Sequence, residues 1–322
     1  MSRWVPTSAE QIQVATGSQE AIYLCAVAML SAGDVVLVEE PTYLAAVQAF
    51  SMVGARLVSV PSDDDGVIPA ELERLIDEHG PKLVYLIPNF QNPTGRTYSL
   101  QRRRDVAEVL VRKGVALIED DPYGELRFEG ESLPPLSSMP GMATQSLWLN
   151  SVSKVMTPGL RLGWIRAEPH ALRPIVIAKQ AVALQSPVTE QLVVAHYLEN
   201  YDLDAHVASV REVYKVRRDA MYKGLKAMLP TSAHITYPTG GMFLWVRLGD
   251  GWNTKKLLDV AVEEGVAFVP GWPFYAGEPD QSTMRLSYVT NTPETIAEGL
   301  RRLERAMKRY STMDFEVGAS IS

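Results

Sequence analysis

The chain has 322 residues, of which 46% are hydrophobic and 21% charged, the ordinary composition of a soluble globular protein of about two domains. Its formal net charge of −7 argues against a nucleic-acid-binding surface as its main function. The single cysteine, Cys25, excludes an internal disulfide and a cysteine-rich metal site. The first residues lack the apolar core of a signal peptide, and no later apolar run is long enough to cross a bilayer. We therefore expect a cytoplasmic protein whose partners include neither nucleic acid nor a membrane.

Strands and helices alternate through the first half of the chain. Apolar runs bounded by turn residues predict strands at Gln11–Ala15, Val35–Val38, Arg56–Val60, Lys82–Ile87, Val115–Ile118 and Leu147–Leu149. Periodic segments between them predict helices at Ala21–Leu30, Leu44–Val53, Ala70–Glu78 and Ser99–Lys113. This alternation predicts an α/β fold with a mostly parallel sheet sandwiched by helices, and ligands bind beyond the carboxyl ends of such strands.

Polar clusters follow four of the predicted strands. They contain Gly17, Ser18 and Gln19 after the first strand, Tyr43 after the second, Asn92 after the fourth, and Asp120 with Tyr123 after the fifth. A helix that begins with Gly-Ser offers free N–H groups to an anion, and a tyrosine at a strand end could stack on a flat ligand. Many helices begin this way without binding anything, however, and Tyr43 fits a packed core position as well.

Around Lys154 the sequence reads SLWLNSVSKVMTPGLRLGW, residues 146–164. Ser151 and Ser153 precede the lysine, and a second apolar run after the Thr157-Pro158-Gly159 turn carries Arg161. Two serines and an arginine supply donors for one anion, and a buried lysine shifts its pKa readily and forms Schiff bases with carbonyls. The alternative is an ordinary hairpin with a partly exposed lysine.

The second half of the chain changes character. Helices are predicted at Ala171–Leu184, Val188–Leu198, Leu203–Leu229, Thr254–Glu264 and Pro293–Tyr310, and strands at His234–Tyr237, Met242–Arg247, Val266–Val269 and Met284–Val289. We expect a large domain over residues 1–202, a smaller α+β domain over 203–310 that includes the bridging helix, and a loosely held tail over 311–322. No His/Cys cluster has the spacing of a metal site.

If the polar clusters meet, they provide every group that one cofactor needs. A phosphate could be held by Gly17, Ser18, Gln19, Ser151, Ser153 and Arg161. Pyridoxal phosphate combines such a phosphate with a lysine Schiff base and a carboxylate on the pyridine nitrogen, for which Lys154 and Asp120 are the candidates. Asn92 and Tyr123 suit the ring's phenolic oxygen, and Arg285 suits the carboxylate of a substrate.

The motifs resemble those of a known family. Asn92-Pro93-Thr94-Gly95, Asp120-x-x-Tyr123 and Ser151-x-Ser153-Lys154, followed by Arg161, resemble fold type I pyridoxal-phosphate aminotransferases of classes I and II. The residues that flank these motifs look closest to the 2-aminoadipate aminotransferase-like branch, to which the aminotransferase-like domains of MocR regulators are related. The resemblance runs from about Gln11 to Tyr310, with the motifs in family order and spacing.

This resemblance implies roles for the candidate residues. Lys154 would form the aldimine with the cofactor and shuttle the proton, Asp120 would pair with the pyridine nitrogen, and Tyr123 would complete the catalytic set. Tyr43 would stack on the ring, Asn92 would contact the phenolic oxygen and the substrate, and Arg285 would bind the substrate α-carboxylate. The phosphate would be held by Gly17, Ser18, Gln19, Ser151, Ser153 and Arg161.

The resemblance also implies a homodimer with active sites at the subunit interface. Family members carry a sizeable segment before the Gly-Ser-Gln loop, whereas this sequence has a short lead-in from Met1. That segment supplies part of the small domain, a substrate-contacting loop and a tyrosine that reaches the neighbouring subunit's phosphate. We therefore expect cofactor binding with impaired transamination unless the segment is supplied.

The expected function is transfer of an amino group from an L-amino acid to a 2-oxo acid, with 2-oxoglutarate as acceptor. One alternative is other pyridoxal-phosphate chemistry such as β-elimination, because this fold hosts many reactions. Another is the effector-binding domain of a MocR-type regulator, or a truncated inactive enzyme.

Overall fold

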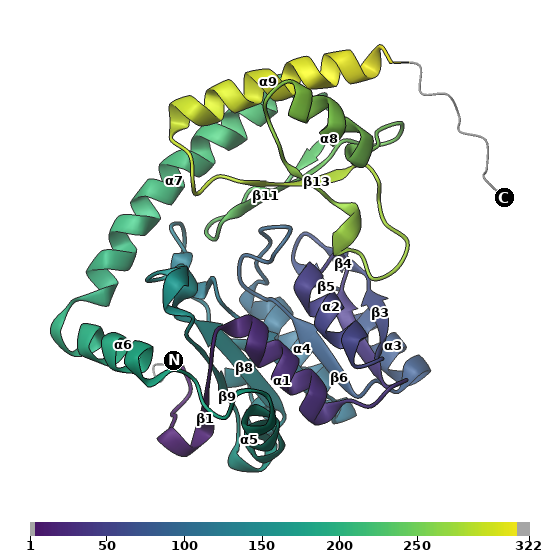
Figure 1. The fold of residues 1–322 in the computed structure, drawn as a ribbon. Helices are drawn as coiled ribbons and strands as arrows, with labels where there is room; N and C mark the ends of the chain where they lie inside the picture. Colours follow the sequence, from purple (N-terminus) through teal and green to yellow (C-terminus); the bar gives the residue numbers. More distant parts are fainter. Residues whose placement is uncertain (1–3, 314–322) are drawn as a thin grey trace.

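A computed structural model describes residues 4–313 and is built around a seven-stranded sheet (Figure 1). Its strand order is β1-β9-β8-β7-β6-β2-β3. The strands are β1 (Ile12–Ala15), β2 (Val35–Glu39), β3 (Arg56–Val60), β6 (Leu83–Leu86), β7 (Ala116–Asp120), β8 (Ser146–Ser151) and β9 (Gly163–Arg166). The predicted α/β class and mostly parallel sheet are confirmed, with β9 antiparallel to both of its neighbours. Because two reversals cancel, β1 runs in the same direction as β8, and Ala15 ends at the same edge as the parallel strands.

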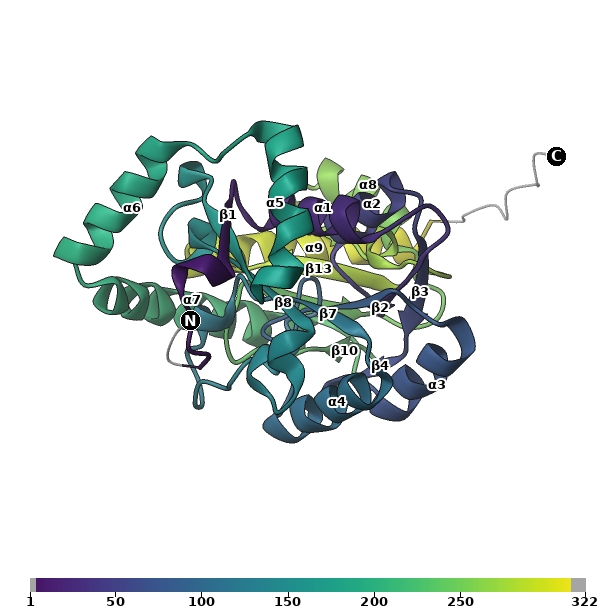
Figure 2. The same ribbon diagram turned by 90° about the horizontal axis from the view of Figure 1, so that it is seen from below.

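Helices cover both faces of this sheet (Figure 2). One face is covered by α1 (Ser18–Met29), α2 (Leu44–Met52) and α5 (Pro169–Ala183), whose buried side chains join one apolar core. The other face is covered by α3 (Pro69–His79) and α4 (Leu100–Lys113), which share a second core. Strands that are buried on both faces have continuous apolar sequences, and every residue of β2 is buried accordingly.

A smaller antiparallel sheet follows, in the order β10-β11-β13-β12. Its strands are β10 (His234–Ile235), β11 (Phe243–Arg247), β12 (Val269–Pro270) and β13 (Thr283–Ser287). With α7 (Leu203–Met228), α8 (Thr254–Glu263) and α9 (Pro293–Ser311) it forms a separate apolar core. The α7 helix begins after Asp202, whose carboxylate accepts a hydrogen bond from the Ala205 N–H at 2.9 Å. This agrees in composition with the predicted small α+β unit, and the domain boundary at residue 202 stays a prediction.

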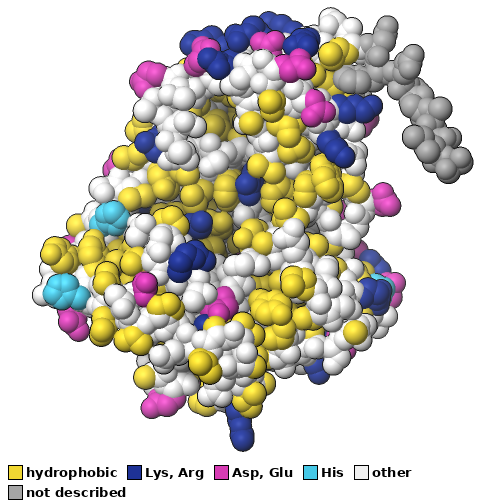
Figure 3. Space-filling view, in the orientation of Figure 1, with side chains coloured by type: hydrophobic (Ala, Val, Ile, Leu, Met, Phe, Trp, Pro, Cys, Tyr) yellow, Lys and Arg dark blue, Asp and Glu magenta, His cyan; other side chains and the backbone are white. Residues whose placement is uncertain are grey.

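The helix α6 (Val188–Asn200) differs from the other helices because Val194 is its single buried residue. Hydrophobic side chains gather over α6 and across the middle of the same face of the molecule (Figure 3). None of the helices within residues 4–313 has the length and apolar character needed to cross a membrane. The last residue of α9 is Ser311, and the rest of the predicted tail beyond Met313 lies outside the described residues.

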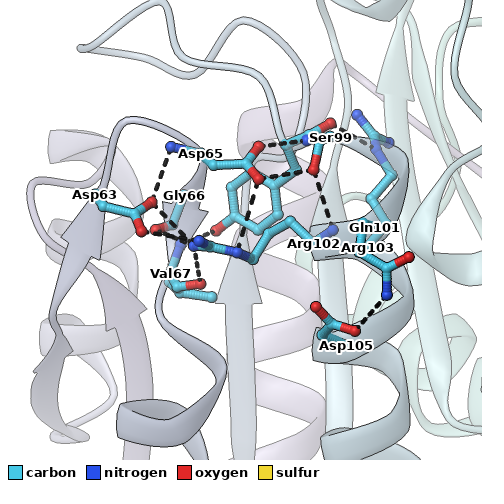
Figure 4. A network of polar contacts seen from close by, with 10 residues as sticks. Asp63, Asp65, Gly66, Val67, Ser99, Gln101, Arg102, Arg103 and Asp105 are labelled. Atoms are coloured by element: carbon cyan, nitrogen blue, oxygen red, sulfur yellow. Dashed lines mark hydrogen bonds and ion pairs between the residues drawn. The ribbon is translucent and has the colours of Figure 1, made fainter.

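The strands of the small sheet differ in their bounds from the sequence prediction, and one hairpin is additional. The last strand before β13 covers Val269–Pro270 rather than Val266–Val269. A two-stranded hairpin, β4 (Ser62–Asp63) and β5 (Gly66–Val67), was not expected. Figure 4 shows that α4 holds this hairpin, since Arg102 donates hydrogen bonds to Asp63 and to the Val67 carbonyl, at 3.0 and 2.7 Å. Strands of two residues carry no period that a sequence could reveal, and side chains distant in sequence stabilise them here.

Candidate functional site

The polar clusters predicted to converge lie around one cavity at the carboxyl edge of the large sheet. The cavity has a volume of about 140 Å³ and is lined by ten of the twelve predicted residues: Gly17, Ser18, Gln19, Tyr43, Asn92, Asp120, Tyr123, Ser153, Lys154 and Arg161. The other two adjoin it. Ser151 Oγ lies 2.8 Å from Ser153 Oγ, and Arg285 Nη1 donates to Asn92 Oδ1 at 2.7 Å. The twelve residues therefore form one constellation, although they come from both sheets.

One end of the cavity is suited to an anion. The first turn of α1 begins at Ser18, and the Gly17 backbone has a φ of 115°, which glycine adopts readily. The Arg161 guanidinium lies against this turn and donates to the Thr16 carbonyl at 2.9 Å. A Cβ atom added to Gly17 would lie 2.8 Å from Arg161 Nη2. Gly17 therefore permits both the backbone conformation and the approach of the arginine.

Arg161 lies just ahead of the strand that its apolar run forms. It follows the short helical turn Pro158–Leu160, has a φ of 44°, and precedes β9, which begins at Gly163. The Pro-Gly pair at the start of this segment favours a turn, which delays the strand by two residues. As a result the guanidinium bends back toward α1 instead of following the sheet.

Lys154 lies at the end of the short helical turn Val152–Lys154, directly after β8. The β8 and β9 strands do form an antiparallel pair, and Lys154 is partly exposed, as the alternative interpretation held. Its side chain nevertheless lines the cavity. Burial lowers the pKa of Lys154, the positive charges of Arg161 and Arg285 lower it further, and Asp120 opposes the shift. An amine with a lowered pKa is more readily available as a nucleophile.

Asp120 is the last residue of β7 and is 2% exposed. Its Oδ2 accepts a hydrogen bond from the Tyr85 hydroxyl at 2.7 Å, whereas its buried Oδ1 has no partner among the described residues. Burial raises the pKa of Asp120 to about 6, against the lowering effects of the Tyr85 hydrogen bond and the Lys154 charge. Sequence reasoning missed Tyr85, because an apolar strand gave no sign that its hydroxyl would meet Asp120.

Two tyrosines line the cavity, and two phenylalanine rings lie close to Arg285. Burial raises the pKa of Tyr43 and of Tyr123, so both hydroxyls stay protonated at neutral pH. The Arg285 guanidinium, from β13 of the small sheet, lies 4.3 Å from the Phe243 ring centroid and 5.1 Å from that of Phe274. Its Nε has no hydrogen-bond partner among the described residues. Such a guanidinium is ready to bind an anion.

These features fit pyridoxal phosphate. An unpartnered buried carboxylate oxygen is costly, and a ligand N–H facing Asp120 Oδ1 would remove that cost. The α1 N-terminus and Arg161 provide donors for a phosphate, and Lys154 and Asp120 line the same cavity. A ligand with a phosphate, a carbonyl and a protonated ring nitrogen would satisfy all three sets of groups.

Comparison with known proteins gives consistent matches over nearly the whole chain. The family model for aminotransferase class I and II matches residues 2–303. An aromatic-amino-acid aminotransferase from Thermococcus litoralis is 40% identical over 309 residues, which cover 94% of this chain and 74% of that protein.

Solved structures agree. The α-aminoadipate aminotransferase from Thermus thermophilus, complexed with N-(5'-phosphopyridoxyl)-L-leucine, superposes with a TM-score of 0.91 at 39% identity, over 96% of this chain and 79% of that one. Kynurenine aminotransferase from Pyrococcus horikoshii, in complex with PMP, gives 0.92 at 37% identity, over 97% and 78%. A more distant match is an uncharacterised HTH-type transcriptional regulator from Bacillus subtilis, 30% identical over 305 residues that make up 95% of this chain and 62% of that protein.

Proposed function

The chain belongs to the class I and II aminotransferase family, and from that premise we propose that it moves an amino group from an L-amino acid to a 2-oxo acid, with 2-oxoglutarate as acceptor. Members of this family act as pyridoxal-phosphate-dependent transaminases. The observation that carries the proposal is the cavity lined by both Lys154, with its lowered pKa, and Asp120, whose buried Oδ1 has no partner among the described residues.

Pyridoxal phosphate, when bound, supplies a ring that accepts the electron pair released at the substrate α-carbon. Asp120 would hold the ring nitrogen protonated through Oδ1, and Lys154 would bind the aldehyde carbon and then move the proton at the α-carbon. Tyr43 would stack on the ring, and Asn92 and Tyr123 would orient the phenolic oxygen. The phosphate would be held by Gly17, Ser18, Gln19, Ser151, Ser153 and Arg161.

Arg285 would bind the substrate α-carboxylate. Its guanidinium already contacts two aromatic rings and is hydrogen-bonded to Asn92, so binding a carboxylate would cost little further conformational entropy. The names of the similar enzymes point to the first amino donors to test: aromatic amino acids, 2-aminoadipate and kynurenine.

Absorbance spectroscopy tests this function directly. Purified protein is mixed with pyridoxal phosphate, reduced with borohydride, and digested to map the modified peptide. We expect a borohydride-sensitive band whose label maps to Lys154, bleaching of that band by an amino donor, and glutamate formation when 2-oxoglutarate is added. The Lys154→Ala variant is the control and should give no label. A label at another lysine, or no band at all, would contradict the proposal.

The second candidate is an effector-binding domain that holds the cofactor without turnover, and the similarity to the Bacillus regulator is its one support. A band that forms normally but is bleached by no amino donor would favour it. Other pyridoxal-phosphate chemistry is separated by product analysis, since β-elimination releases pyruvate and ammonia without an acceptor. The cytoplasmic location expected from the sequence stays a prediction.

We also propose that the protein is a homodimer that pairs through α5 and α6. Exposed apolar side chains gather there: Ile177, Val182, Leu184, Val188, Leu192, Val193, Leu198 and Tyr201. The buried face of α6 packs through Val194 against Val152 and Leu162, which flank the segment carrying Lys154 and Arg161. A second copy on this surface would therefore lie beside the active site, where a dimer with active sites at its interface requires it.

A further inference from the structure

We propose that Tyr85 is a positioning residue for the cofactor and acts through Asp120. Its hydroxyl holds one carboxylate oxygen so that the other faces the ring nitrogen of pyridoxal phosphate. This inference rests on the proposed function and extends it to a residue that neither the motifs nor the cavity lining includes.

The sheet register brings the two side chains together. Tyr85 lies on β6 and pairs with Ile118 of β7, two residues before Asp120. Because side chains alternate along a strand, Tyr85, Ile118 and Asp120 project from the same face of the sheet. The Tyr85 ring is fully buried and packs edge-on against Phe50, with ring centroids 5.6 Å apart. Its hydroxyl therefore has one fixed position, 2.7 Å from Asp120 Oδ2.

This hydrogen bond is the carboxylate's one anchor within the described part of the chain. No other group there donates to either oxygen, and Oδ1 is buried without a partner. A carboxylate held through one oxygen has a fixed plane, so the lone pairs of the second oxygen have a fixed direction as well. Without the hydroxyl, neither carboxylate oxygen would have a hydrogen-bond donor among the described residues, so the carboxylate plane would no longer be fixed and the attraction of Lys154 would be left to offset the cost of burial.

The electrostatics agree with this geometry. The titratable groups coupled to the Asp120 carboxyl are Tyr85 on β6, Lys154 after β8, Cys25 on α1, Tyr43 before α2 and Tyr123 after β7. Among these five, Lys154 is the one cation, and its amine is the group that would react with the cofactor's aldehyde. Tyr85 is therefore the donor that continues to favour the ionised carboxylate after Lys154 has reacted.

The test is the Tyr85→Phe variant, which removes one hydroxyl and keeps the packing against Phe50. We expect its dissociation constant for pyridoxal phosphate near neutral pH to rise about tenfold, the effect of one hydrogen bond to a charged group. We also expect the acidic limb of the affinity-versus-pH curve to move upward by about one pH unit, because loss of the donor raises the pKa of Asp120.

A cofactor analogue separates positioning from a general structural effect. In deaza-pyridoxal phosphate a C–H group replaces the ring nitrogen, so Asp120 Oδ1 has no N–H to accept. The affinity ratio of wild type to Tyr85→Phe should then fall to about one. Tyr98→Phe is the matched control, since the Tyr98 hydroxyl also donates to a buried carboxylate, Glu39, at 2.7 Å, but lies outside the cavity lining. It should leave both affinities near those of the wild type.

Two failures are distinguishable. Wild-type protein that binds no pyridoxal phosphate overturns the proposed function. Wild-type protein that binds the cofactor while Tyr85→Phe binds it equally well, or loses the same factor for cofactor and deaza analogue, overturns the positioning role and leaves the proposed function standing.

Discussion

At the scale of single residues, the site contains buried polar atoms that have no hydrogen-bond partner among the described residues. Among the described residues Asp120 Oδ1 and Arg285 Nε are buried without partners, and each belongs to a side chain that is held by a hydrogen bond through another atom. Leaving these atoms unpaired costs stability, but it also keeps them in position for a ligand that would pair with them. Replacing such a residue should therefore raise the stability of the cofactor-free protein and lower its affinity for the ligand.

Asp120 gives a direct case. An acid whose pKa is raised in the folded state destabilises that state once it ionises, and burial raises the pKa of Asp120 from 3.8 to about 6. This destabilisation is absent where the carboxyl is protonated in both states, grows as the pH rises from about 4 to 6, and is complete above that range.

We therefore expect the cofactor-free Asp120→Asn variant to be more stable than wild type near pH 7 by about 2 kcal/mol, and the difference to vanish near pH 4. Its affinity for pyridoxal phosphate should fall at the same time. Urea unfolding at the two pH values measures the first effect, and absorbance titration measures the second. A variant that is less stable at both pH values would contradict this account.

A substitution at Gly17 tests the end of the cavity that is suited to an anion. The Gly17→Ala change should weaken phosphate-dependent cofactor binding by about tenfold, because the new Cβ would displace the Arg161 guanidinium from its contact with the α1 turn. Gly33→Ala is the matched control, since Gly33 also has a positive φ, of 89°, but has open space where its Cβ would stand. Titration with pyridoxal phosphate and with pyridoxal, which lacks the phosphate, separates the effect on phosphate binding from the effect of backbone strain. Gly17→Ala should weaken binding of the phosphorylated form, whereas Gly33→Ala should lower stability and leave both affinities unchanged.

At the scale of elements, α4 fixes the loop that carries Asn92. Arg103 is fully buried on α4 and donates hydrogen bonds to the carbonyls of Tyr98, Pro88 and Pro134 and to Asn89 Oδ1. The negative charges of Glu119 and Asp121 act on the same guanidinium. One side chain thus holds both ends of the loop between β6 and α4, and the geometry of Asn92 depends on it.

Arg103→Met should destabilise the protein by about 3 kcal/mol or more, because the substitution leaves three backbone carbonyls and the Asn89 amide oxygen without their donor and removes the positive charge near Glu119 and Asp121. Arg104→Met is the control on the same helix, since Arg104 is exposed and should change stability by less than about 0.5 kcal/mol. Chemical denaturation of the cofactor-free proteins measures both. Equal stability of the two variants would show that the buried network contributes little.

At the scale of the whole molecule, the proposed dimer interface on α5 and α6 can be tested by substitution. Replacing Leu192, which is 64% exposed, by glutamate places a charge in the proposed interface and should convert dimer to monomer. Val262→Glu is the control, because Val262 on α8 is 58% exposed and lies outside that surface. Light scattering coupled to size-exclusion chromatography reads the mass. A wild type that is monomeric, or a Leu192→Glu variant that stays dimeric, would exclude this surface.

The sequence was sufficient for the elements that have a period or a motif. Continuous apolar runs placed six of the seven strands of the large sheet, and the polar residues that follow them placed the cavity, because parallel strands bring their carboxyl ends to one edge. The motif spacing around Asn92, Asp120 and Lys154 identified the family that the comparisons confirm.

The tertiary structure alone decided how these residues meet. Arg161 reaches the α1 turn because a Pro-Gly turn delays β9, the β4–β5 hairpin exists because Arg102 holds it, and Tyr85 reaches Asp120 because two strands pair in one register. Each of these depends on contacts between residues far apart in the chain. A single sequence reports local period and residue type, whereas register and long-range side-chain contacts are fixed when the chain packs.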